Sequence, residues 1–277
     1  MIAAQMTFLT KLASASRARD SIVCIGLDPE PDQIPEHLGR GPQAAVRFLR
    51  RIVAATSDLA CAYKPNLAFF EQYGSAGVDV LGLTLQTIPS DIPVILDAKR
   101  GDVPNTSAAY AQALFGRWKG DAVTVAPYVG MDSIAPFCER GYALVLARTS
   151  NPGAGDLQDL EIDGRPLYEH VVTMTVSRFP AGECGFVVGS TYPAEARRIR
   201  ELAPDRLFLM PGVGTQGGQL GKAIEAAADR GGGGVLPSAS RSILYASRGK
   251  DFETAAAQAA SALRDGANEA RLAVGSR

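Results

Sequence analysis

The sequence predicts an α/β protein in which eight parallel strands and their connecting helices close into a (β/α)8 TIM barrel. Eight short runs rich in β-branched and other apolar residues recur along the 277-residue chain. Most of these runs are continuous rather than alternating, as is typical of parallel strands covered by helices. The segments between them are long enough for a crossover connection, and barrels of about 250 residues form one domain. We therefore expect a single domain over residues 1–277.

The first expected element is an N-terminal helix over residues 5–17, because Phe8, Leu9 and Leu12 share one helical face. The eight expected strands then follow in chain order at residues 22–27, 60–63, 94–96, 122–125, 143–147, 185–188, 207–210 and 234–236. The longest insertion, residues 150–163, is rich in glycine and proline and is interpreted as a mobile loop over a site. A doubly wound open sheet would give the same alternation of elements and is the alternative architecture.

The charge of the chain favours a small-molecule ligand. Its 28 lysine and arginine residues and 29 acidic residues leave a net charge of −1 and are scattered along the sequence. This distribution offers no basic stripe for a nucleic acid and no polybasic patch for a membrane. No apolar run reaches the roughly 18 residues of a membrane span, and the N-terminus lacks the pattern of a signal peptide. We expect a cytoplasmic protein.

The cysteines and histidines do not predict a metal site. Cysteines stand at 24, 61, 138 and 184 without a CxxC pair, and three of them fall inside strand-like runs, where core packing is their expected role. The two histidines, His37 and His170, have no neighbouring His, Cys or paired acid in sequence. A zinc site or a Ser-His-Asp triad is therefore not expected.

The run Val94-Ile-Leu-Asp-Ala-Lys-Arg-Gly-Asp102 leads an apolar strand directly into charged residues. Side chains two positions apart share a face of an extended strand, so Asp97 and Lys99 should point the same way, with Asp102 at the exit. Each close charge pair is worth roughly 4 kcal/mol at an effective dielectric constant near 20. Two carboxylates would thus keep Lys99 protonated, as an acid rather than a nucleophile. A structural ion pair is the alternative for an isolated DxKxxD pattern.

Functional residues of a barrel gather at the carboxyl ends of its strands. The unusual residues of this chain fall at those positions: Asp28 after the first strand, Lys64 after the second, Asp97 and Lys99 at the third, Ser150 after the fifth, residues 212–217 after the seventh and residues 238–241 after the eighth. Their coincidence predicts one site at one end of the barrel.

The segment Pro211-Gly-Val-Gly-Thr-Gln-Gly217 matches GxGxxG, but it lies late in the chain and has no acidic residue about 20 positions on. A dinucleotide site is therefore disfavoured. A glycine-rich turn after the seventh strand instead suits a phosphate held between the last two loops of a barrel. The guanidinium of Arg241 could grip that phosphate with two hydrogen bonds, and Ser238 and Ser240 could add hydroxyls. A surface salt bridge is the alternative role for Arg241.

These motifs resemble the orotidine 5′-phosphate decarboxylase family, specifically its longer bacterial branch. The resemblance spans residues 26–241 in the order of the family. It rests on Gly26-Leu-Asp28, Ala62-Tyr-Lys-Pro65, Leu96-Asp-Ala-Lys-Arg-Gly-Asp102 followed by Asn105-Thr106, Thr149-Ser-Asn-Pro-Gly153, Pro211-Gly-Val-Gly-Thr-Gln216 and Ser240-Arg241.

The resemblance implies an alternating charged array of Lys64, Asp97, Lys99 and Asp102. In that family the last carboxylate comes from the neighbouring subunit, which implies a homodimer in which Asp102 and Thr106 reach into the partner's site. Asp28 and Thr106 would hold ribose hydroxyls, Ser150 the pyrimidine edge, and Gln216 and Arg241 the phosphate. The implied reaction converts orotidine 5′-monophosphate (OMP) to uridine 5′-monophosphate (UMP) and carbon dioxide, the last step of UMP synthesis, without metal or organic cofactor.

Three other functions remain open at this point. A sugar-phosphate decarboxylase of the same superfamily uses a similar Asp/Lys/Asp spacing with magnesium. A Schiff-base aldolase would need a neutral lysine, which the flanking carboxylates disfavour. A non-catalytic nucleotide-binding barrel would retain the phosphate site but has little use for buried charges.

Overall fold

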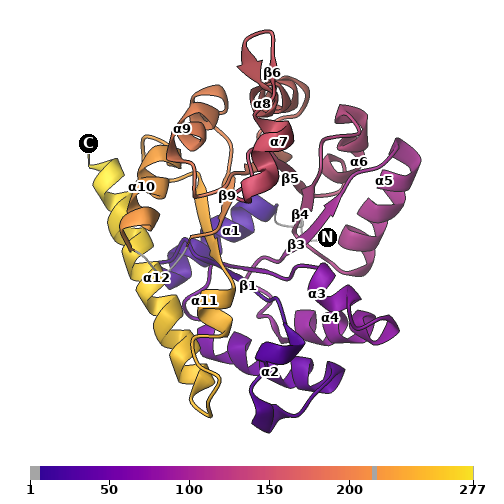
Figure 1. Cartoon of the computed structure of the whole chain (residues 1–277), viewed down its shortest axis with the longest axis vertical. Helices are drawn as coiled ribbons and strands as arrows, with labels where there is room; N and C mark the ends of the chain where they lie inside the picture. The colour runs from indigo at the N-terminus through magenta and orange to yellow at the C-terminus, as the bar shows by residue number, and fades with distance from the viewer. Residues whose placement is uncertain (1–6, 214–216, 277) are drawn as a thin grey trace, which may run out of the picture.

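Eight parallel strands form the wall of a barrel in the computed structural model, which describes residues 7–213 and 217–276. The strands are β1 (Cys24–Gly26), β2 (Ala62–Lys64), β3 (Ile95–Arg100), β4 (Ala122–Val125), β5 (Tyr142–Leu146), β8 (Cys184–Val187), β9 (Phe208–Pro211) and β10 (Val235–Ala239). Their order in the sheet is β2-β1-β10-β9-β8-β5-β4-β3. Parallel bridges from Tyr63 to Val94 and from Asn66 to Asp97 join the two end strands. The chain thus runs around a ring (Figure 1), which confirms the barrel and excludes the open sheet.

All eight expected strands are present in the described residues, and residues 122–125 match β4 throughout. The largest difference is at β3, which continues to Arg100, whereas the apolar pattern predicted an end at residue 96. Charged residues extend this strand because its last part lies at the open mouth of the barrel. There the side chains of Asp97 and Lys99 pair with each other.

Helices surround the barrel wall (Figure 1). The helices that follow the strands are α2 (Pro42–Thr56), α3 (Ala68–Glu71), α4 (Ser75–Thr87), α5 (Pro104–Ala111) with the π-helical turn η3 (Gln112–Arg117), α6 (Ala135–Cys138), α8 (Leu167–Arg178), α9 (Pro193–Leu202), α10 (Gly217–Ala227), α11 (Arg241–Leu244) and α12 (Phe252–Gly275). Short 3-10 turns lie at η1 (Pro31–Gln33), η2 (Glu36–Leu38) and η4 (Met131–Ser133). Helix α2 shows why they pack: Phe48, Leu49 and Ile52 recur at helical spacing and are buried.

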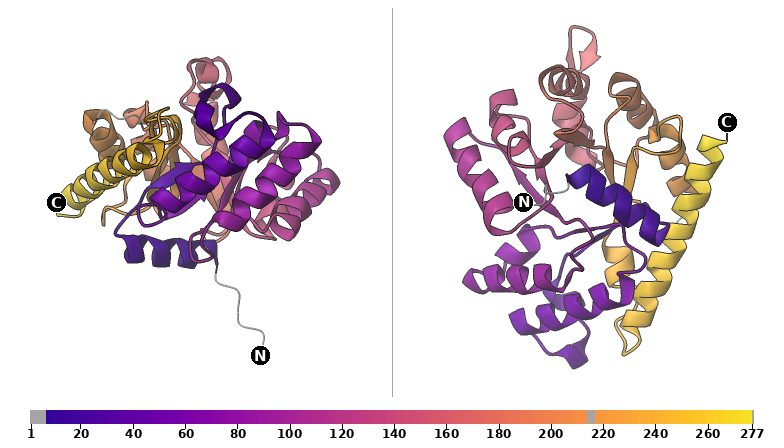
Figure 2. Two further views of the ribbon diagram at one scale, coloured as in Figure 1. Left: turned by 90° about the horizontal axis from the view of Figure 1, so that it is seen from below. Right: turned by 180° about the vertical axis from the view of Figure 1, so that it is seen from behind.

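Helix α1 (Phe8–Arg19) covers the amino-terminal end of the barrel (Figure 2). The side chains of Phe8 and Leu12 are buried among residues of the barrel interior, and the ring of Phe8 lies 5.0 Å from that of Tyr142. The expected N-terminal helix is therefore confirmed from Phe8 onward, whereas residues 5 and 6 lie outside the described part. With this end covered, the mouth at the carboxyl ends of the strands is the open end.

The insertion at residues 150–163 has more structure than the expected loop. It contains η5 (Pro152–Ala154), α7 (Gly155–Gln158) and β6 (Glu161–Ile162), which pairs with β7 (Arg165–Pro166). Arg148, which is buried, donates two hydrogen bonds to the carboxylate of Asp159, at 2.7 and 2.9 Å. This bidentate pair fixes the insertion to the segment that follows β5. The glycine and proline content of the insertion predicted a loop and gave no sign of this contact.

The four cysteines are free and buried, as expected of core residues. Burial raises the pKa of Cys24 to about 12, so this thiol is neutral and packs as an apolar group. His37 packs near Phe252, and His170 contacts the carbonyl of Ile162. Within residues 7–213 and 217–276, no three His, Cys, Asp or Glu side chains form a metal-binding group. No helix in the same ranges has both the length and the apolar character needed to cross a bilayer.

Candidate active site

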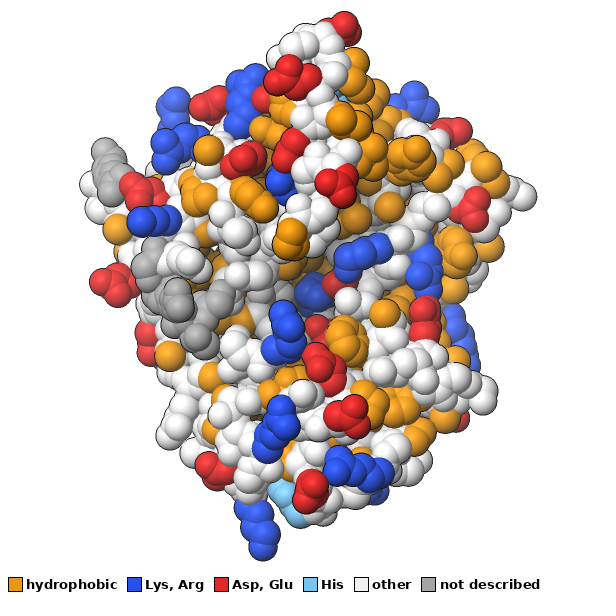
Figure 3. All heavy atoms as spheres, viewed as in Figure 1, with side chains coloured by type: hydrophobic (Ala, Val, Ile, Leu, Met, Phe, Trp, Pro, Cys, Tyr) orange, Lys and Arg blue, Asp and Glu red, His pale blue; other side chains and the backbone are white. Residues whose placement is uncertain are grey.

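A cavity of about 1080 Å³ opens at the carboxyl ends of the strands. Charged side chains gather around this hollow near the centre of the face in Figure 3. Its polar lining comes from nearly every strand end of the barrel and includes Asp28, Lys64, Asn66, Asp97, Lys99, Thr124, Thr149, Ser150, Gln158, Ser238, Ser240 and Arg241. Residues as far apart in sequence as Asp28 and Arg241 therefore line one cavity, as their positions at the strand ends predicted.

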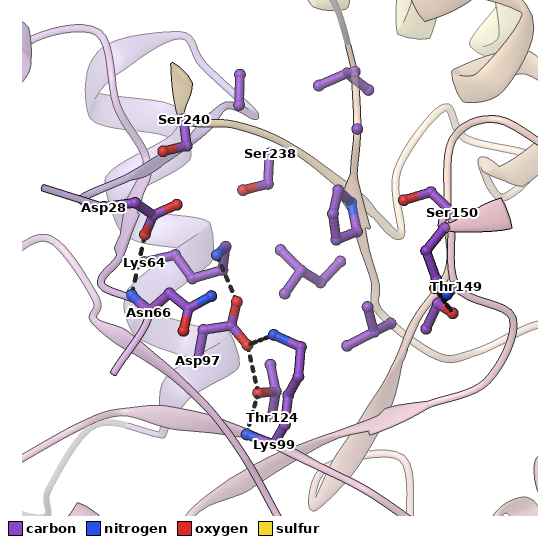
Figure 4. Close-up of a pocket in the computed structure, with 18 of the residues that line it drawn as sticks. Asp28, Lys64, Asn66, Asp97, Lys99, Thr124, Thr149, Ser150, Ser238 and Ser240 are labelled. Atoms are coloured by element: carbon purple, nitrogen blue, oxygen red, sulfur yellow. Dashed lines mark hydrogen bonds and ion pairs between the residues drawn. The ribbon is translucent and has the colours of Figure 1, made fainter. Parts of the chain in front are cut away.

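Asp97 is the centre of a buried charge cluster (Figure 4). Its Oδ2 accepts a hydrogen bond from Lys64 Nζ at 2.8 Å, and its Oδ1 accepts one from Lys99 Nζ at 2.6 Å. Thr124 Oγ1 donates a third bond to the same Oδ1, at 2.8 Å. The side chains of Asp97 and Lys64 are only 8% and 7% exposed, whereas that of Lys99 is 48% exposed. The Lys99 ammonium is thus held by Asp97 but accessible from the cavity.

The ion pairs set the charges of the cluster. Burial would raise the pKa of Asp97, but the positive charges of Lys64 and Lys99 outweigh burial and hold this pKa well below its usual range. Burial acts to lower the pKa of Lys64, but the charges of Asp97 and Asp28 outweigh it and raise this pKa above its usual value. At neutral pH, therefore, Asp97 is a carboxylate and Lys64 an ammonium.

Asp102 follows β3 at its exit, as expected, but within the described residues its carboxylate does not pair with Lys99 of the same chain. It is not among the residues that line the cavity, and its Oδ1 accepts a hydrogen bond from the backbone N–H of Val103 at 2.7 Å. The chain leaves β3 at Gly101, where a Cβ would lie 2.4 Å from the carbonyl oxygen of Ala126, and enters α5. Within the described part of one chain, Asp97 is thus the carboxylate that pairs with Lys99. The expectation of two carboxylates around Lys99 within one chain is wrong.

Thr106 lies on α5, also outside the cavity lining of its own chain. The family resemblance implies that Asp102 and Thr106 act in the site of a partner subunit.

Another part of the cavity lining is suited to an anion. It includes Gly212, with a φ of +88°, and Val213, together with Ser238, Ser240 and Arg241. The hydroxyl of Ser240 is buried and has no hydrogen-bond partner in the described part of the chain, so it is free to bind a ligand. Gln216 lies outside the described residues.

Asp28 lies between Ser240 and Lys64 in the cavity (Figure 4). Its side chain is largely buried, and its Oδ1 accepts a hydrogen bond from the backbone N–H of Asn66 at 3.2 Å. The hydroxyl of Tyr245 donates to the carbonyl of Asp28 and accepts from the N–H of Glu30, both at 2.7 Å. The loop after β1 is thereby tied to the end of α11, the helix that begins at Arg241.

Several lining residues were missed from the sequence. Thr124 lies in the run 122–125, which was interpreted only as a buried strand, although its place near the carboxyl end of that strand could have marked it. Asn66 follows the marked Lys64 by two residues. Gln158 reaches the cavity only because the insertion folds back, and its Oε1 accepts a hydrogen bond from the backbone N–H of Thr149 at 2.8 Å. No sequence signal indicated that contact.

Comparisons with known proteins agree in one family. The profile described as "Orotidine 5'-phosphate decarboxylase / HUMPS family" matches residues 21–258. The chain is 46% identical over 259 residues to the orotidine 5'-phosphate decarboxylase of Herpetosiphon aurantiacus, covering 92% of this chain and 96% of that protein. It is 44% identical over 273 residues to that of an Azoarcus species, covering 96% and 100%. Its fold is similar to the solved structure of the Leishmania donovani OMP decarboxylase, with a TM-score of 0.84, 35% identity, and coverage of 96% and 99%.

Proposed function

This chain belongs to the orotidine 5′-phosphate decarboxylase / HUMPS family, and we propose that it decarboxylates OMP to UMP with Lys99 as the proton donor at C6. The observation that carries the proposal is the shared cavity: the ammonium of Lys99 and the guanidinium of Arg241 line the same pocket, with Asp28 and Ser150 also in its lining. A nucleotide has a reacting base at one end and a phosphate at the other. In this pocket, Lys99 is the proposed partner of the base and Arg241 that of the phosphate.

The lining residues suggest how OMP is oriented. Arg241, together with the hydroxyls of Ser238 and Ser240, binds the phosphate as a dianion. Asp28 accepts hydrogen bonds from ribose hydroxyls, and Ser150 binds the edge of the pyrimidine. In this orientation C6 of the base faces Lys99. Gln216 belongs to the phosphate end by the resemblance of its motif.

The reaction breaks the bond between C6 and its carboxylate. The bonding electron pair stays on C6, carbon dioxide leaves, and the pair then takes a proton from Lys99 Nζ to form UMP. The carbanion at C6 is poorly delocalised, so catalysis must stabilise charge where it develops. A fixed ammonium does this and then supplies the proton. Solvent reprotonates Lys99 between turnovers.

Asp97 has two roles in this proposal. It holds the ammonium groups of Lys64 and Lys99 through its two oxygens. It also remains ionised at neutral pH, so the substrate carboxylate is bound next to a negative charge, and this repulsion is relieved as neutral carbon dioxide departs. Binding energy from the distant phosphate offsets the unfavourable arrangement.

We also propose that the active unit is a homodimer with shared sites and that residues 1–277 act as one catalytic domain. Asp102 and Thr106 do not line the cavity of their own chain, and exposed apolar side chains occur on the same segment and on the neighbouring loop after β4. These exposed residues are Val103 after β3, Tyr110 on α5, and Tyr128 and Val129 after β4. A second copy covering this surface would bury them and bring Asp102 to the partner's pocket. The four free thiols suit a reducing compartment, so we place the enzyme in the cytoplasm.

An absorbance assay with OMP tests the proposed function. We expect release of UMP by the purified chain, with the same rate in EDTA and in added magnesium, because the charge of Lys99 replaces that of a metal ion. A magnesium-dependent sugar-phosphate decarboxylase would instead lose its rate in EDTA and leave OMP unchanged. A purified chain that binds UMP but does not consume OMP would instead be a non-catalytic nucleotide-binding barrel.

The phosphate role of Arg241 has its own prediction. Arg241→Ala should lower kcat/KM for OMP about 10- to 100-fold, because a charge-assisted hydrogen bond contributes roughly 1.5–3 kcal/mol. Turnover of orotidine, which lacks the phosphate, should change by less than about twofold. Arg248→Ala is the matched control, since Arg248 is also exposed near α11 but does not line the cavity. An equal loss with OMP and orotidine would place Arg241 outside the phosphate site.

A further inference from the structure

The strand ladder between β3 and β4 is interrupted at the charge cluster. Leu96 pairs with Val123 and Arg100 pairs with Val125, so the three residues 97–99 of β3 stand opposite one residue of β4, Thr124. Such a bulge leaves backbone groups without their usual partners across the ladder. The interruption at residues 97–99 includes two members of the charge cluster, Asp97 and Lys99.

The hydroxyl of Thr124 replaces the missing ladder bond. It accepts a hydrogen bond from the backbone N–H of Lys99 at 3.0 Å and donates its own proton to Asp97 Oδ1 at 2.8 Å. Because a hydroxyl has one proton to donate, these two bonds have a fixed direction. Figure 4 shows the resulting chain from the Lys99 backbone through Thr124 to the carboxylate. One side chain thus binds both the backbone of Lys99 and the carboxylate that holds its ammonium.

The backbone of Lys99 needs this support. Its φ is +46°, in the left-handed region that a lysine rarely adopts and that persists only where the surroundings determine it. This conformation lets Lys99 Nζ return to Asp97 Oδ1 at 2.6 Å from a bulged strand. The side chain of Thr124 is buried, whereas that of Lys99 is half exposed, so Thr124 is the fixed member of the pair.

We propose that Thr124 is a positioning residue for proton delivery: it holds the left-handed backbone of Lys99 and the carboxylate of Asp97 in one arrangement, so that the ammonium is aimed at C6. The inference rests on the proposed decarboxylation. It predicts an effect on the chemical step and little effect on nucleotide binding, because the proposed phosphate contact is made by Arg241, another residue of the cavity lining, and not by Thr124.

The experiment compares Thr124→Val and Thr124→Ser with the wild type, using OMP. Valine keeps the shape and the β-branch but removes both hydrogen bonds, whereas serine keeps the hydroxyl. Leaving the Lys99 N–H and the Asp97 oxygen without this partner should lower kcat about 10- to 100-fold in Thr124→Val, with KM within about threefold of wild type. Thr124→Ser should recover most of the lost rate.

A second measurement reports on proton delivery alone. Exchange of the C6 proton of UMP with D2O, followed by NMR, is the reverse of the delivery step and should slow in Thr124→Val in parallel with kcat. Thr84→Val is the matched control: Thr84 is also buried, and its hydroxyl donates to a carbonyl, that of Val80, on a helix away from the cavity. It should lower thermal stability without changing kcat or the exchange rate.

Three results would overturn the inference: a Thr124→Val enzyme with wild-type kcat and exchange, a serine variant as slow as the valine variant, or a loss confined to KM. A wild-type enzyme that does not consume OMP would refute the proposed function instead. The two failures are therefore distinguishable.

Discussion

Lys99→Ala should lower kcat for OMP by about 10⁴-fold or more, the largest effect expected of any single substitution in this chain. General acid catalysis typically contributes up to about 10⁴-fold, and a fixed charge at the reacting atom adds to it. Alanine removes both the proton and the positive charge next to C6. The rate is measured by the loss of OMP absorbance under saturating substrate, and the fold by circular dichroism.

Lys99→Arg separates the two roles of this ammonium. A guanidinium keeps the positive charge but does not give up a proton in proteins, so it can stabilise the C6 carbanion without protonating it. We expect Lys99→Arg to remain far below wild type. Both variants should still bind UMP, because the phosphate end of the cavity is intact. A folded Lys99→Ala enzyme with substantial turnover would contradict the assignment of Lys99 as the proton donor.

The barrel could be predicted from sequence because it depends on local patterns. Continuous apolar runs such as residues 122–125 reflect burial on both faces of a parallel strand, and this signal survives without knowledge of the neighbours. Helix α1 could also be predicted from a local pattern, because Phe8 and Leu12 are spaced to share one helical face. The positions of Lys64, Asp97 and Arg241 in the cavity then follow from topology, because all carboxyl ends of a parallel barrel meet at one mouth.

What the sequence did not reveal depends on contacts between distant segments or on local departures from regular geometry. The rule that alternate residues share a face placed Lys99 beside Asp97, but the contact is made through a bulge and a left-handed residue. Asp102 follows the exit of the strand, as expected, but the chain turns out of the sheet at Gly101 and its carboxylate does not pair with Lys99 in the described part of one chain. The folded insertion depends on the pairing of Arg148 with Asp159, two residues whose types alone do not identify them as partners.

Asp102→Ala should lower kcat about 10²- to 10³-fold, because the Lys99 ammonium would lose the carboxylate that a partner subunit is proposed to supply. If the site is shared, mixing this variant with Lys99→Ala should restore activity that neither has alone. In a heterodimer, one pocket lacks both groups, whereas the other has Lys99 from one chain and Asp102 from its partner. Random exchange in an equal mixture makes half of the dimers heterodimers, so about a quarter of all sites should regain wild-type turnover.

A mixture of Lys99→Ala with Asp97→Ala is the matched control for this complementation. Asp97 and Lys99 of one chain bind each other at 2.6 Å, so they belong to the same pocket, and no heterodimer of these two variants contains a complete site. This mixture should remain inactive. If subunit exchange is confirmed by mass spectrometry and the mixture with Asp102→Ala is equally silent, Asp102 does not cross between subunits. Recovery only in the mixture of Lys99→Ala with Asp102→Ala would show that each pocket receives the carboxylate of Asp102 from the neighbouring chain.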